Sequence, residues 1–357
     1  MNFHPARVAS HPALPVLDLA QSNGRRRGAF LEQLREAASG PGFFYLAGHG
    51  VPTGLAELVL SHAQAFFAAP LEERLTVSNL QSPHFRGYSG VGAERTGGLA
   101  DHREQLDVGP ERPARVVGPD DPPWWRLEGP NLWPPTMPGL RELLLTWSEL
   151  LAEVAERLLR LLAHALELPG DWFDDTLAGQ PHTHLKVIRY PGRAEPAGQG
   201  VGRHQDYGLL TLLLQDSTGG LQVLADEGGR GSAGVSGQAP RVVDVQPLGA
   251  PGETFVVNLG EMLEVATNGY LRATSHRVVS PPAGTQRLSV PFFFNPNLDA
   301  VLQPAPLPAA LAARARGVTD DPANPMLSGY GANALKGWLR AHPRVAERHH
   351  PDLLTTT

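Results

Sequence analysis

The chain has 357 residues, a formal net charge of -6 and a hydrophobic fraction of 41%, so it is long enough to bury a sizeable core in one or two domains. It contains no cysteine, which excludes disulfides, thiolate metal sites and cysteine nucleophiles. The mild acidity gives no electrostatic reason to expect nucleic acid or an anionic membrane as a partner.

The first third of the chain predicts short strands that alternate with helices. The apolar runs at residues 14–19 and 42–46 are typical of buried strands. Residues 27–38 and 53–69 predict amphipathic helices that end at a glycine and a proline respectively. We expect Thr53 to cap the second of these helices, because a threonine oxygen can accept from the free N–H groups of the first turn.

The rest of the chain predicts one long helix and then a series of short strands. The helical pattern covers residues 140–168, and its apolar stripe is wide enough to back a sheet. The apolar runs that follow are separated by turn residues and indicate an antiparallel sandwich or barrel. These runs are residues 185–190, 209–215, 221–224, 242–245, 254–258, 276–279 and 288–294. Residues 226–240 predict a Gly/Ala/Ser-rich hairpin loop, residues 327–341 a closing helix and residues 349–357 a frayed end.

This order of elements predicts one α+β unit, mainly β, in which helices back a barrel core that carries every candidate ligand. We divide it into an N-terminal helical and strand region (residues 1–135), the barrel region with its backing helices (residues 136–345) and a C-terminal tail (residues 346–357). No apolar run reaches membrane-spanning length, and residues 1–15 lack the apolar stretch of a signal peptide. We therefore expect a soluble cytoplasmic protein, a monomer or weak homo-oligomer, with neither a membrane nor a nucleic-acid partner.

A candidate metal site is indicated by His204 and Asp206, followed far downstream by His276. The first two side chains are two residues apart and would share one face of an extended strand. They lie between a glycine-rich segment, residues 198–202, that reads as a turn and the apolar run that follows, so we expect them at the mouth of the barrel. Two imidazoles and one carboxylate with open positions are the facial triad of non-haem Fe(II) oxygenases.

A candidate carboxylate clamp follows on the next predicted strand. Arg287 and Ser289 share a face of that strand, and they offer a guanidinium fork and a hydroxyl to a carboxylate. If this strand pairs with the strand of His276 as a hairpin, the clamp lies across from a metal ligand. A carboxylate clamp near such a metal site is the chemistry of an oxygenase that binds a keto acid beside its iron.

Other histidines and charged residues are weaker candidates. His102 and Glu104 form a second His-x-acid pair, but no third ligand and clamp follow it, which favours a strand at the pocket rim. His182 and His184 read as structural histidines at the start of a strand. The substrate could contact five residues, namely Arg86, Tyr88, Arg103, Gln105 and Tyr207. Either arginine could pair with a substrate carboxylate, although salt bridges are the default interpretation.

Several segments together are similar to one protein family. They are residues 203–208 (RHQDYG), 219–223 (GGLQV), 256–262 (VVNLGEM), 275–278 (SHRV) and 291–294 (PFFF), with residues 42–51 and 85–88 in the N-terminal region. As a set these motifs are highly specific, and the resemblance covers most of the chain. The sequence resembles the isopenicillin N synthase-like branch of the Fe(II)/2-oxoglutarate-dependent oxygenases.

The resemblance implies a double-stranded β-helix, or jelly roll, with helices on one side. It implies His204, Asp206 and His276 as ligands of Fe(II). It also implies Arg287 and Ser289 as the site of the distal carboxylate of 2-oxoglutarate. Lys186 and Tyr190 fall where members place side chains that contact this cosubstrate, whereas many plant members have Asn where this chain has Ile188. The long segment 226–240 is atypical of the family.

Four functions fit these residues. The first is an oxygenase that uses Fe(II), 2-oxoglutarate and O2 to oxidise a C–H bond of a small molecule, with decarboxylation of 2-oxoglutarate to succinate. The second is an Fe(II) oxidase without 2-oxoglutarate, in which Arg287 and Ser289 hold a carboxylate of the substrate itself. A zinc hydrolase would not need that clamp, and the intact triad argues against a non-catalytic barrel. We expect the first function, by hydroxylation, desaturation or cyclisation.

Overall fold

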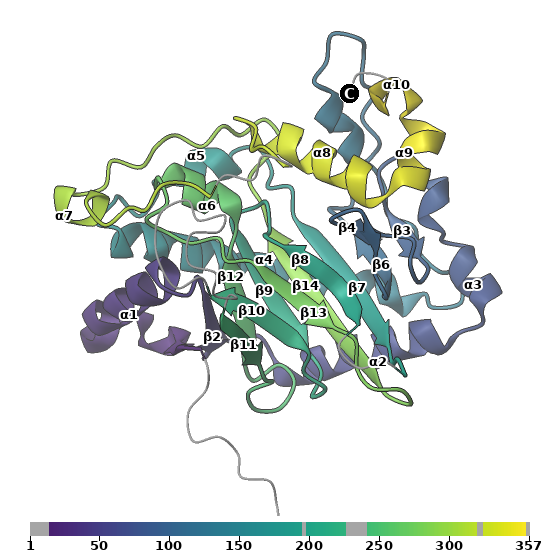
Figure 1. Cartoon of the computed structure of the whole chain (residues 1–357), viewed down its shortest axis with the longest axis horizontal. Coiled ribbons are helices and arrows are strands. Elements are labelled where there is room, and N and C mark those ends of the chain that lie inside the picture. The colour runs from purple at the N-terminus through teal and green to yellow at the C-terminus, as the bar shows by residue number, and fades with distance from the viewer. Residues whose placement is uncertain (1–13, 195–197, 226–240, 320–323, 355–357) are drawn as a thin grey trace, which may run out of the picture.

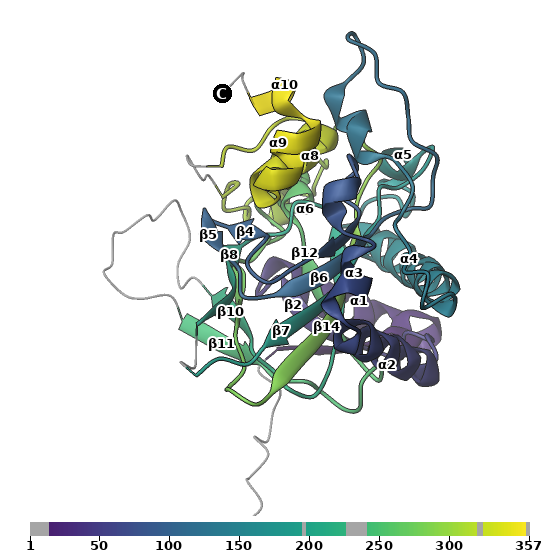
Figure 2. The ribbon, with the colours of Figure 1, turned by 90° about the vertical axis from the view of Figure 1, so that its right-hand side faces the viewer.

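The computed structural model describes residues 14–194, 198–225, 241–319 and 324–354. The loop expected at residues 226–240 lies outside these ranges. So do residues 1–13, which make up most of the segment without a signal-peptide pattern. Within them the chain forms two β-sheets that face each other, with long helices on the outer face of the larger sheet (Figures 1 and 2).

The two sheets differ in size. The larger has eight strands in the order β1-β2-β12-β9-β14-β7-β6-β3, and the smaller has four in the order β11-β10-β13-β8. All neighbours pair antiparallel except β1 and β2, which run parallel. The strands are β1 (Val16–Asp18), β2 (Phe43–Ala47), β3 (Gly87–Ser89), β6 (Glu104–Val108), β7 (His184–Pro191), β8 (Gln199–His204), β9 (Leu210–Gln215), β10 (Leu221–Ala225), β11 (Arg241–Val245), β12 (Phe255–Leu259), β13 (His276–Val279) and β14 (Gln286–Phe294), with a separate hairpin of β4 (Arg95–Thr96) and β5 (Leu99–Ala100).

The larger sheet separates two apolar cores. Successive side chains of a strand point to opposite faces, so Val187 of β7 packs in the core under the helices, whereas Ile188 and Tyr190 pack in the core between the sheets. In β9, Leu212 and Leu214 face the helices and Leu213 faces the inner core. This alternation fixes which side chains of each strand can reach a site inside the barrel.

Helices cover the face of the larger sheet that points away from the smaller one (Figure 2). The long helix α4 (Gly139–Ala165) contacts β9 and β14, and α2 (Thr53–Ala68) contacts β7 and β14. Helix α1 (Arg27–Ser39) packs against α4, and the Trp147 side chain of α4 is fully buried. The remaining helices are α3 (Leu71–Leu75), α5 (Asp174–Leu177), α6 (Glu261–Ala266), α7 (Ala309–Ala312), α8 (Tyr330–Ala341), α9 (Pro343–His349) and α10 (Pro351–Leu354), with short 3-10 turns at Leu19–Ser22, Gly24–Arg26, Asn79–Gln81 and Pro123–Leu127.

The N-terminal region and the barrel region share one sheet. Strands β1 and β2 extend one edge of the larger sheet, and β6 and β3 extend the other. The expected barrel with helical backing is therefore confirmed, with its larger sheet built from both regions. The boundaries at residues 135 and 345 stay predictions.

Two local expectations are wrong. The glycine-rich segment that reads as a turn is strand β8, and its glycines allow close approach, because a Cβ on Gly200 would lie 3.0 Å from the carbonyl oxygen of Val278. The strands β13 and β14 do not pair as a hairpin. The strand β13 pairs with β8 and β10 in the smaller sheet, and β14 pairs with β7 and β9 in the larger one. The clamp therefore faces the metal ligands from the opposite sheet.

Two helix ends also differ from expectation. Pro52 rather than Thr53 precedes α2, and no side chain of the described residues caps that helix. The C-terminal tail does not fray over residues 349–354, because His350 is buried and stacks on Phe85 at a ring distance of 5.3 Å. No helix in the described ranges is both long enough and apolar enough to cross a membrane.

Candidate active site

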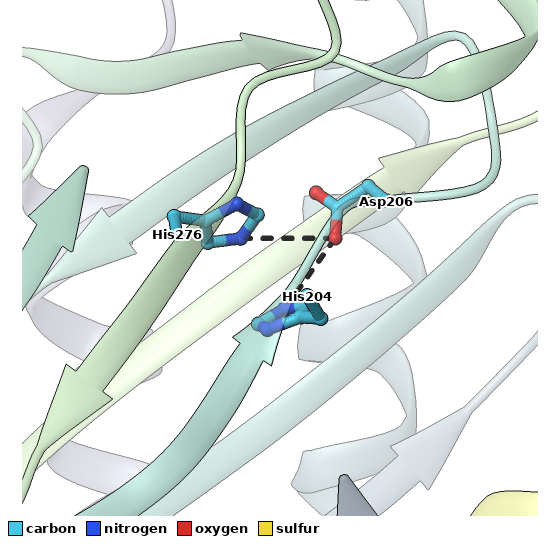
Figure 3. A group of neighbouring side chains, drawn as sticks. All are labelled: His204, Asp206 and His276. Carbon is cyan, nitrogen blue, oxygen red and sulfur yellow. Dashed lines mark ion pairs between the residues drawn. The ribbon is translucent and has the colours of Figure 1, made fainter. Parts of the chain in front are cut away.

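The two candidate histidine ligands come from neighbouring strands of the smaller sheet. His204 is the last residue of β8 and His276 the first of β13, and the two are paired in register. Their ring centroids lie 4.2 Å apart, and the edge of Phe43 packs against His276. Figure 3 shows both rings turned toward Asp206, which lies on the loop that follows β8.

Backbone carbonyls fix the orientation of both rings. The Nδ1 atom of His204 lies 2.8 Å from the carbonyl oxygen of Gly202, and Nδ1 of His276 lies 3.1 Å from that of Thr274. A carbonyl only accepts, so each Nδ1 carries the proton and each Nε2 keeps its lone pair. This is the tautomer that a metal ligand requires, with the other ring nitrogen held by an outer partner.

Asp206 is held so that one carboxylate oxygen faces the two rings. Its Oδ2 accepts from Thr211 Oγ1 at 2.6 Å and from Asn258 Nδ2 at 2.7 Å. Its Oδ1 lies 3.7 Å from Nε2 of His204 and 3.8 Å from Nε2 of His276. One ligand atom from each of the three residues falls within 4.8 Å of the others, and in the described part of the chain no other group of His, Cys, Asp or Glu does so.

The electrostatics of the three residues suit a divalent cation. Burial, and then the neighbouring His276, lowers the pKa of His204 to about 4. Burial acts to raise the pKa of Asp206, but the two imidazoles and the hydrogen bonds from Asn258 and Thr211 outweigh it and leave this pKa lowered. At neutral pH His204 is therefore neutral and Asp206 is ionised, which are the forms that ligate a metal. The donor set fits Fe(II).

Arg287 lies across the barrel on β14, beside Tyr190 of β7. Its side chain is buried, and Nη2 donates to Gln215 Oε1 at 3.2 Å, whereas Nε and Nη1 have no hydrogen-bond partner among the described residues. Buried donors without a partner are costly unless a ligand completes them. The guanidinium N–H groups that remain can bind a carboxylate, and the buried Ser289 lies on the same face of β14. These residues fit the distal carboxylate of 2-oxoglutarate.

One cavity of about 850 Å³ joins these groups, a volume typical of a small-molecule site. It is lined by the three candidate ligands, by the clamp residues, and by Tyr190 and Lys186. Of the five residues proposed to contact substrate, Arg103 and Tyr207 line this cavity. His182 and His184, expected to be structural, also line it.

The other three candidates point elsewhere. Arg86 donates to the carbonyl of Leu127 at 3.1 Å, Tyr88 to Glu104 at 2.6 Å and Gln105 to Asp107 at 2.7 Å. None of the three lines the cavity, and each has a structural partner instead. Glu104 of the second His-x-acid pair also accepts from Arg189 and Arg74, so its role is to hold strands together.

Strand β7 presents its cavity-facing residues in a fixed order. Tyr190 is opposite Arg287 and Ile188 is opposite Ser289. Lys186 comes next, and it pairs with Glu94 at 2.8 Å and lies 3.5 Å from Asp107. Four residues of strand correspond to about 13 Å, so Lys186 is far along the strand from the level of Arg287. The apolar side chain of Ile188 offers no hydrogen bond between them.

Two family models match separate parts of the chain. Residues 14–136 match a model described as the N-terminal region of non-haem dioxygenases in morphine synthesis. Residues 182–296 match the 2OG-Fe(II) oxygenase superfamily, and this segment includes every candidate ligand and clamp residue. The first match lies in the N-terminal region and the second in the barrel region.

Whole-chain relatives agree with these matches. A 2-oxoglutarate-dependent dioxygenase of Dothideomycetidae sp. (strain 11243) is 33% identical over 365 residues, which cover 97% of this chain and 94% of that protein. A homoarginine-6-hydroxylase of Oryza sativa subsp. japonica is 35% identical over 280 residues, which cover 77% of this chain and 80% of that protein. The chain belongs to the 2OG-Fe(II) oxygenase superfamily.

The fold of this oxygenase is that of solved members. The crystal structure of a 2OG-Fe(II) oxygenase family protein from Caulobacter crescentus matches with a TM-score of 0.69 and 24% identity, over 91% of this chain and 98% of that one. The jelly roll expected from the sequence is thus confirmed. The protein is an Fe(II)- and 2-oxoglutarate-dependent dioxygenase of small molecules, and its relatives do not support the oxidase alternative.

Some residues of the oxygenase site escape the sequence reasoning. Thr211 and Asn258 orient Asp206, Gln215 orients Arg287, and Trp338 of α8 forms part of the cavity wall. The motif around Asn258 belongs to the resemblance, but only the register of β12 against β9 brings its amide to the carboxylate. Nothing local in the sequence marks Trp338.

Proposed function

We propose that His204, Asp206 and His276 hold Fe(II) in this dioxygenase, and that Arg287 and Ser289 bind the distal carboxylate of 2-oxoglutarate with Tyr190 beside them. The convergence of three ligand atoms within 4.8 Å carries the metal assignment. The Nε and Nη1 donors of the buried Arg287, which lack a partner in the described ranges, support the cosubstrate assignment. The role expected for Lys186 in cosubstrate binding is less favoured, because its charge is directed to Glu94 and Asp107.

The reaction of bound Fe(II) and 2-oxoglutarate determines the roles that the residues of the site must play. With Fe(II) and 2-oxoglutarate in place, O2 is activated, 2-oxoglutarate is decarboxylated to succinate and a C–H bond of the substrate is oxidised. The three side chains would hold Fe(II), and a set of two histidines and one carboxylate would leave positions for cosubstrate and O2. Because Oδ2 of Asp206 accepts from Thr211 and Asn258, Oδ1 would be its ligand oxygen. Arg287 fixes the far end of 2-oxoglutarate and thereby the position of the whole molecule in the cavity.

The substrate is a small molecule, and the cavity has room for it beside the cosubstrate. The relatives differ in substrate: one is a homoarginine-6-hydroxylase, and one solved structure, from Neurospora crassa, holds thymine. The reaction on this substrate is hydroxylation, desaturation or cyclisation. A cytoplasmic location, a monomeric or weakly oligomeric state and the absence of a nucleic-acid partner stay predictions from the sequence.

The proposal is tested on protein loaded anaerobically with Fe(II) and 2-oxoglutarate. We expect a weak visible charge-transfer band, followed on admission of O2 by succinate and CO2. His276→Ala should lose iron and the band together, because three ligands leave no redundancy. His164→Ala, a change in α4 far from the cavity, is the matched control and should retain both. Full iron binding and turnover in His276→Ala would overturn the metal assignment.

A further inference from the structure

Further along β7 from the cosubstrate residues, the same cavity is lined by buried charges, and we call this part of it the second lobe. Two cations line it, Arg103 beside the start of β6 and Lys186 on β7, and Glu94 lies between them. Each of the three side chains is about nine-tenths buried or more. We call Glu94, Arg103 and Lys186 the Glu94 cluster. It lies near Trp338 of α8, which also lines the cavity.

The carboxylate of Glu94 is flanked by its two neighbours. Its Oε1 accepts from Lys186 Nζ at 2.8 Å, and its Oε2 lies 3.0 Å from Arg103 Nη2. Burial acts to raise the pKa of Glu94, but Arg103 and Lys186 outweigh it and lower this pKa to about 2. The acid is therefore ionised, and both cations are held rigidly at its sides.

Two further acids stand behind the cations and do not line the cavity. Asp101 accepts from Thr96, Gln199 and the backbone of Gly202 and also pairs with Arg103. Asp107 accepts from Gln105 and pairs with His184 and Lys186. These carboxylates are saturated by donors of the protein. By contrast, Nε of Arg103 is buried and meets no hydrogen-bond partner in the described part of the chain, and Oε2 of Glu94, although ion-paired with Arg103, also forms no hydrogen bond there. Arg103 therefore offers a buried donor to a ligand.

The charges that line the cavity also favour a negatively charged ligand. Among the described residues that line it, the cations are Arg95, Arg103, Lys186, Arg203, Arg287 and Arg340, and the acids are Glu94, Asp206 and Glu261. With Arg287 assigned to the cosubstrate and Asp206 to the metal, five cations and two acids of that set remain. The whole chain carries a net charge of -6, so the positive cavity runs against the overall charge. A cleft lined by one sign of charge concentrates ligands of the other sign.

An aromatic wall completes the lobe. The ammonium group of Lys186 lies 5.1 Å from the centre of the Trp338 ring, and His184 meets the same ring edge to face at 4.7 Å. Phe293 of β14 lines the cavity nearby and packs against His184 at 6.0 Å. An apolar or aromatic body can therefore lie against Trp338 and Phe293 while a polar group reaches the cations.

We propose that this dioxygenase takes a carboxylate-bearing small molecule as its primary substrate, with the carboxylate bound by Arg103 and Lys186 on either side of Glu94. This inference rests on the proposed function, since it assigns the second lobe of the same cavity. The two cations are preorganised by Glu94, Asp101 and Asp107, so they lose little freedom on binding. A substrate with only a cationic head group would meet Arg103 and Lys186 on either side of Glu94.

The test uses matched pairs of probes on the holoenzyme. Protein loaded with Mn(II) and 2-oxoglutarate without O2 has its cosubstrate site filled, so a second carboxylate can enter only the other lobe. The probes are phenylacetate, indole-3-acetate and L-homoarginine, each beside its primary amide, with thymine as a neutral ring. Binding is measured by calorimetry and by quenching of tryptophan fluorescence. We expect at least one acid to bind about tenfold or more tightly than its amide.

Two variants assign that preference to the cluster. Arg103→Gln alone would leave the buried Glu94 with one cation fewer and destabilise the fold, so Glu94→Gln/Arg103→Gln, which removes one charge of each sign, is the main variant. It should melt cooperatively, bind 2-oxoglutarate as the unmodified protein does and lose most of the acid-over-amide preference. Arg160→Gln, at an exposed salt bridge with Asp174, is the control for loss of a cation and should keep the preference.

Each contrary result has a distinct meaning. If no acid binds better than its amide, or if thymine binds best, the inference is wrong while the metal and 2-oxoglutarate assignments are untouched. If the preference survives in the double variant, the carboxylate site lies elsewhere. If the double variant loses as much affinity for 2-oxoglutarate as for the probe acid, Arg103 binds the cosubstrate and the inference is again wrong. Failure to bind metal or 2-oxoglutarate in the unmodified protein would instead contradict the proposed function.

Discussion

At the scale of single residues, the site depends on side chains that hold the ligands rather than on the ligands alone. Asp206 has two oxygens, and the hydrogen bonds from Thr211 and Asn258 decide which of them faces the histidines. Arg287 is positioned in the same way by Gln215. The sequence predicts His204, Asp206 and His276 because two histidines and an acid in this pattern suit iron. It does not predict their supports, because amides and hydroxyls are common and their partners are set by strand register.

We expect Asn258→Ala to weaken Fe(II) binding by about 10- to 100-fold, the usual cost of losing an outer partner of a metal ligand. Without the amide, Asp206 can rotate and its Oδ1 is no longer fixed toward the rings. Metal titration of the apoprotein measures this, with Asn297→Ala as a control, since that amide donates to the backbone carbonyls of residues 176 and 178. Equal iron affinity in Asn258→Ala and in the unmodified protein would show that Thr211 suffices.

Arg287→Lys should raise the KM for 2-oxoglutarate by about tenfold or more, because an ammonium keeps the charge but loses the two parallel N–H groups that a carboxylate matches. Iron binding should change little, since Arg287 lies on β14 in the opposite sheet from the histidines. Initial rates of succinate formation at several cosubstrate concentrations give the KM. An unchanged KM in this variant would move the cosubstrate carboxylate to another group.

At the scale of elements, the sequence predicts strands well where apolar residues alternate and poorly where glycine replaces them. The apolar run of β9 is predicted almost to the residue, whereas β8 reads as a turn because Gly198, Gly200 and Gly202 suggest one. Those glycines are needed for packing: a Cβ on Gly200 would lie 2.9 Å from a ring carbon of Tyr190. The assignment of β13 and β14 to opposite sheets is a long-range property that no local pattern contains.

Gly200→Ala tests this interpretation of β8. We expect a loss of about 1–3 kcal/mol in the free energy of unfolding from overpacking, together with a raised KM for 2-oxoglutarate, because the displaced Tyr190 ring packs beside Arg287. Chemical denaturation and steady-state kinetics provide the two measurements. Gly54→Ala in α2 is the matched control, since a Cβ there meets no described atom within 4 Å. Similar behaviour of the two variants would mean that β8 adjusts without moving Tyr190.

At the scale of the whole molecule, one sheet ties the N-terminal region to the barrel and thereby builds the second lobe of the cavity. Strand β6 pairs with β7, which brings the segment containing Arg103 and Glu94 over the cosubstrate strand. The sequence predicts both regions and a strand at the pocket rim, but not the pairing of that strand with β7, which no local pattern contains. In β6, Leu106 and Val108 lie in the core under the helices, whereas Glu104 and Asp107 are buried in ion pairs.

These buried charges should make the stability of the protein depend on pH in the acid range. Because its two cations lower the folded-state pKa of Glu94 from 4.5 to about 2, the stabilisation from this carboxylate is present above about pH 4.5 and is lost as the pH falls toward 2. Burial lowers the pKa of His184 to about 4, so below about pH 6.5 the unfolded chain takes up its proton first and stability falls there too.

Comparison with Glu94→Gln separates the two contributions. This variant cannot ionise at position 94, so we expect it to be less stable than the unmodified protein at pH 7 and to approach it as the pH falls from about 4.5 toward 2. Between about pH 6.5 and 5 both proteins should lose stability in parallel, because His184 is present in each. Urea denaturation at a series of pH values measures the difference. A gap that stays constant down to about pH 3 would mean that Glu94 is not held ionised by Arg103 and Lys186.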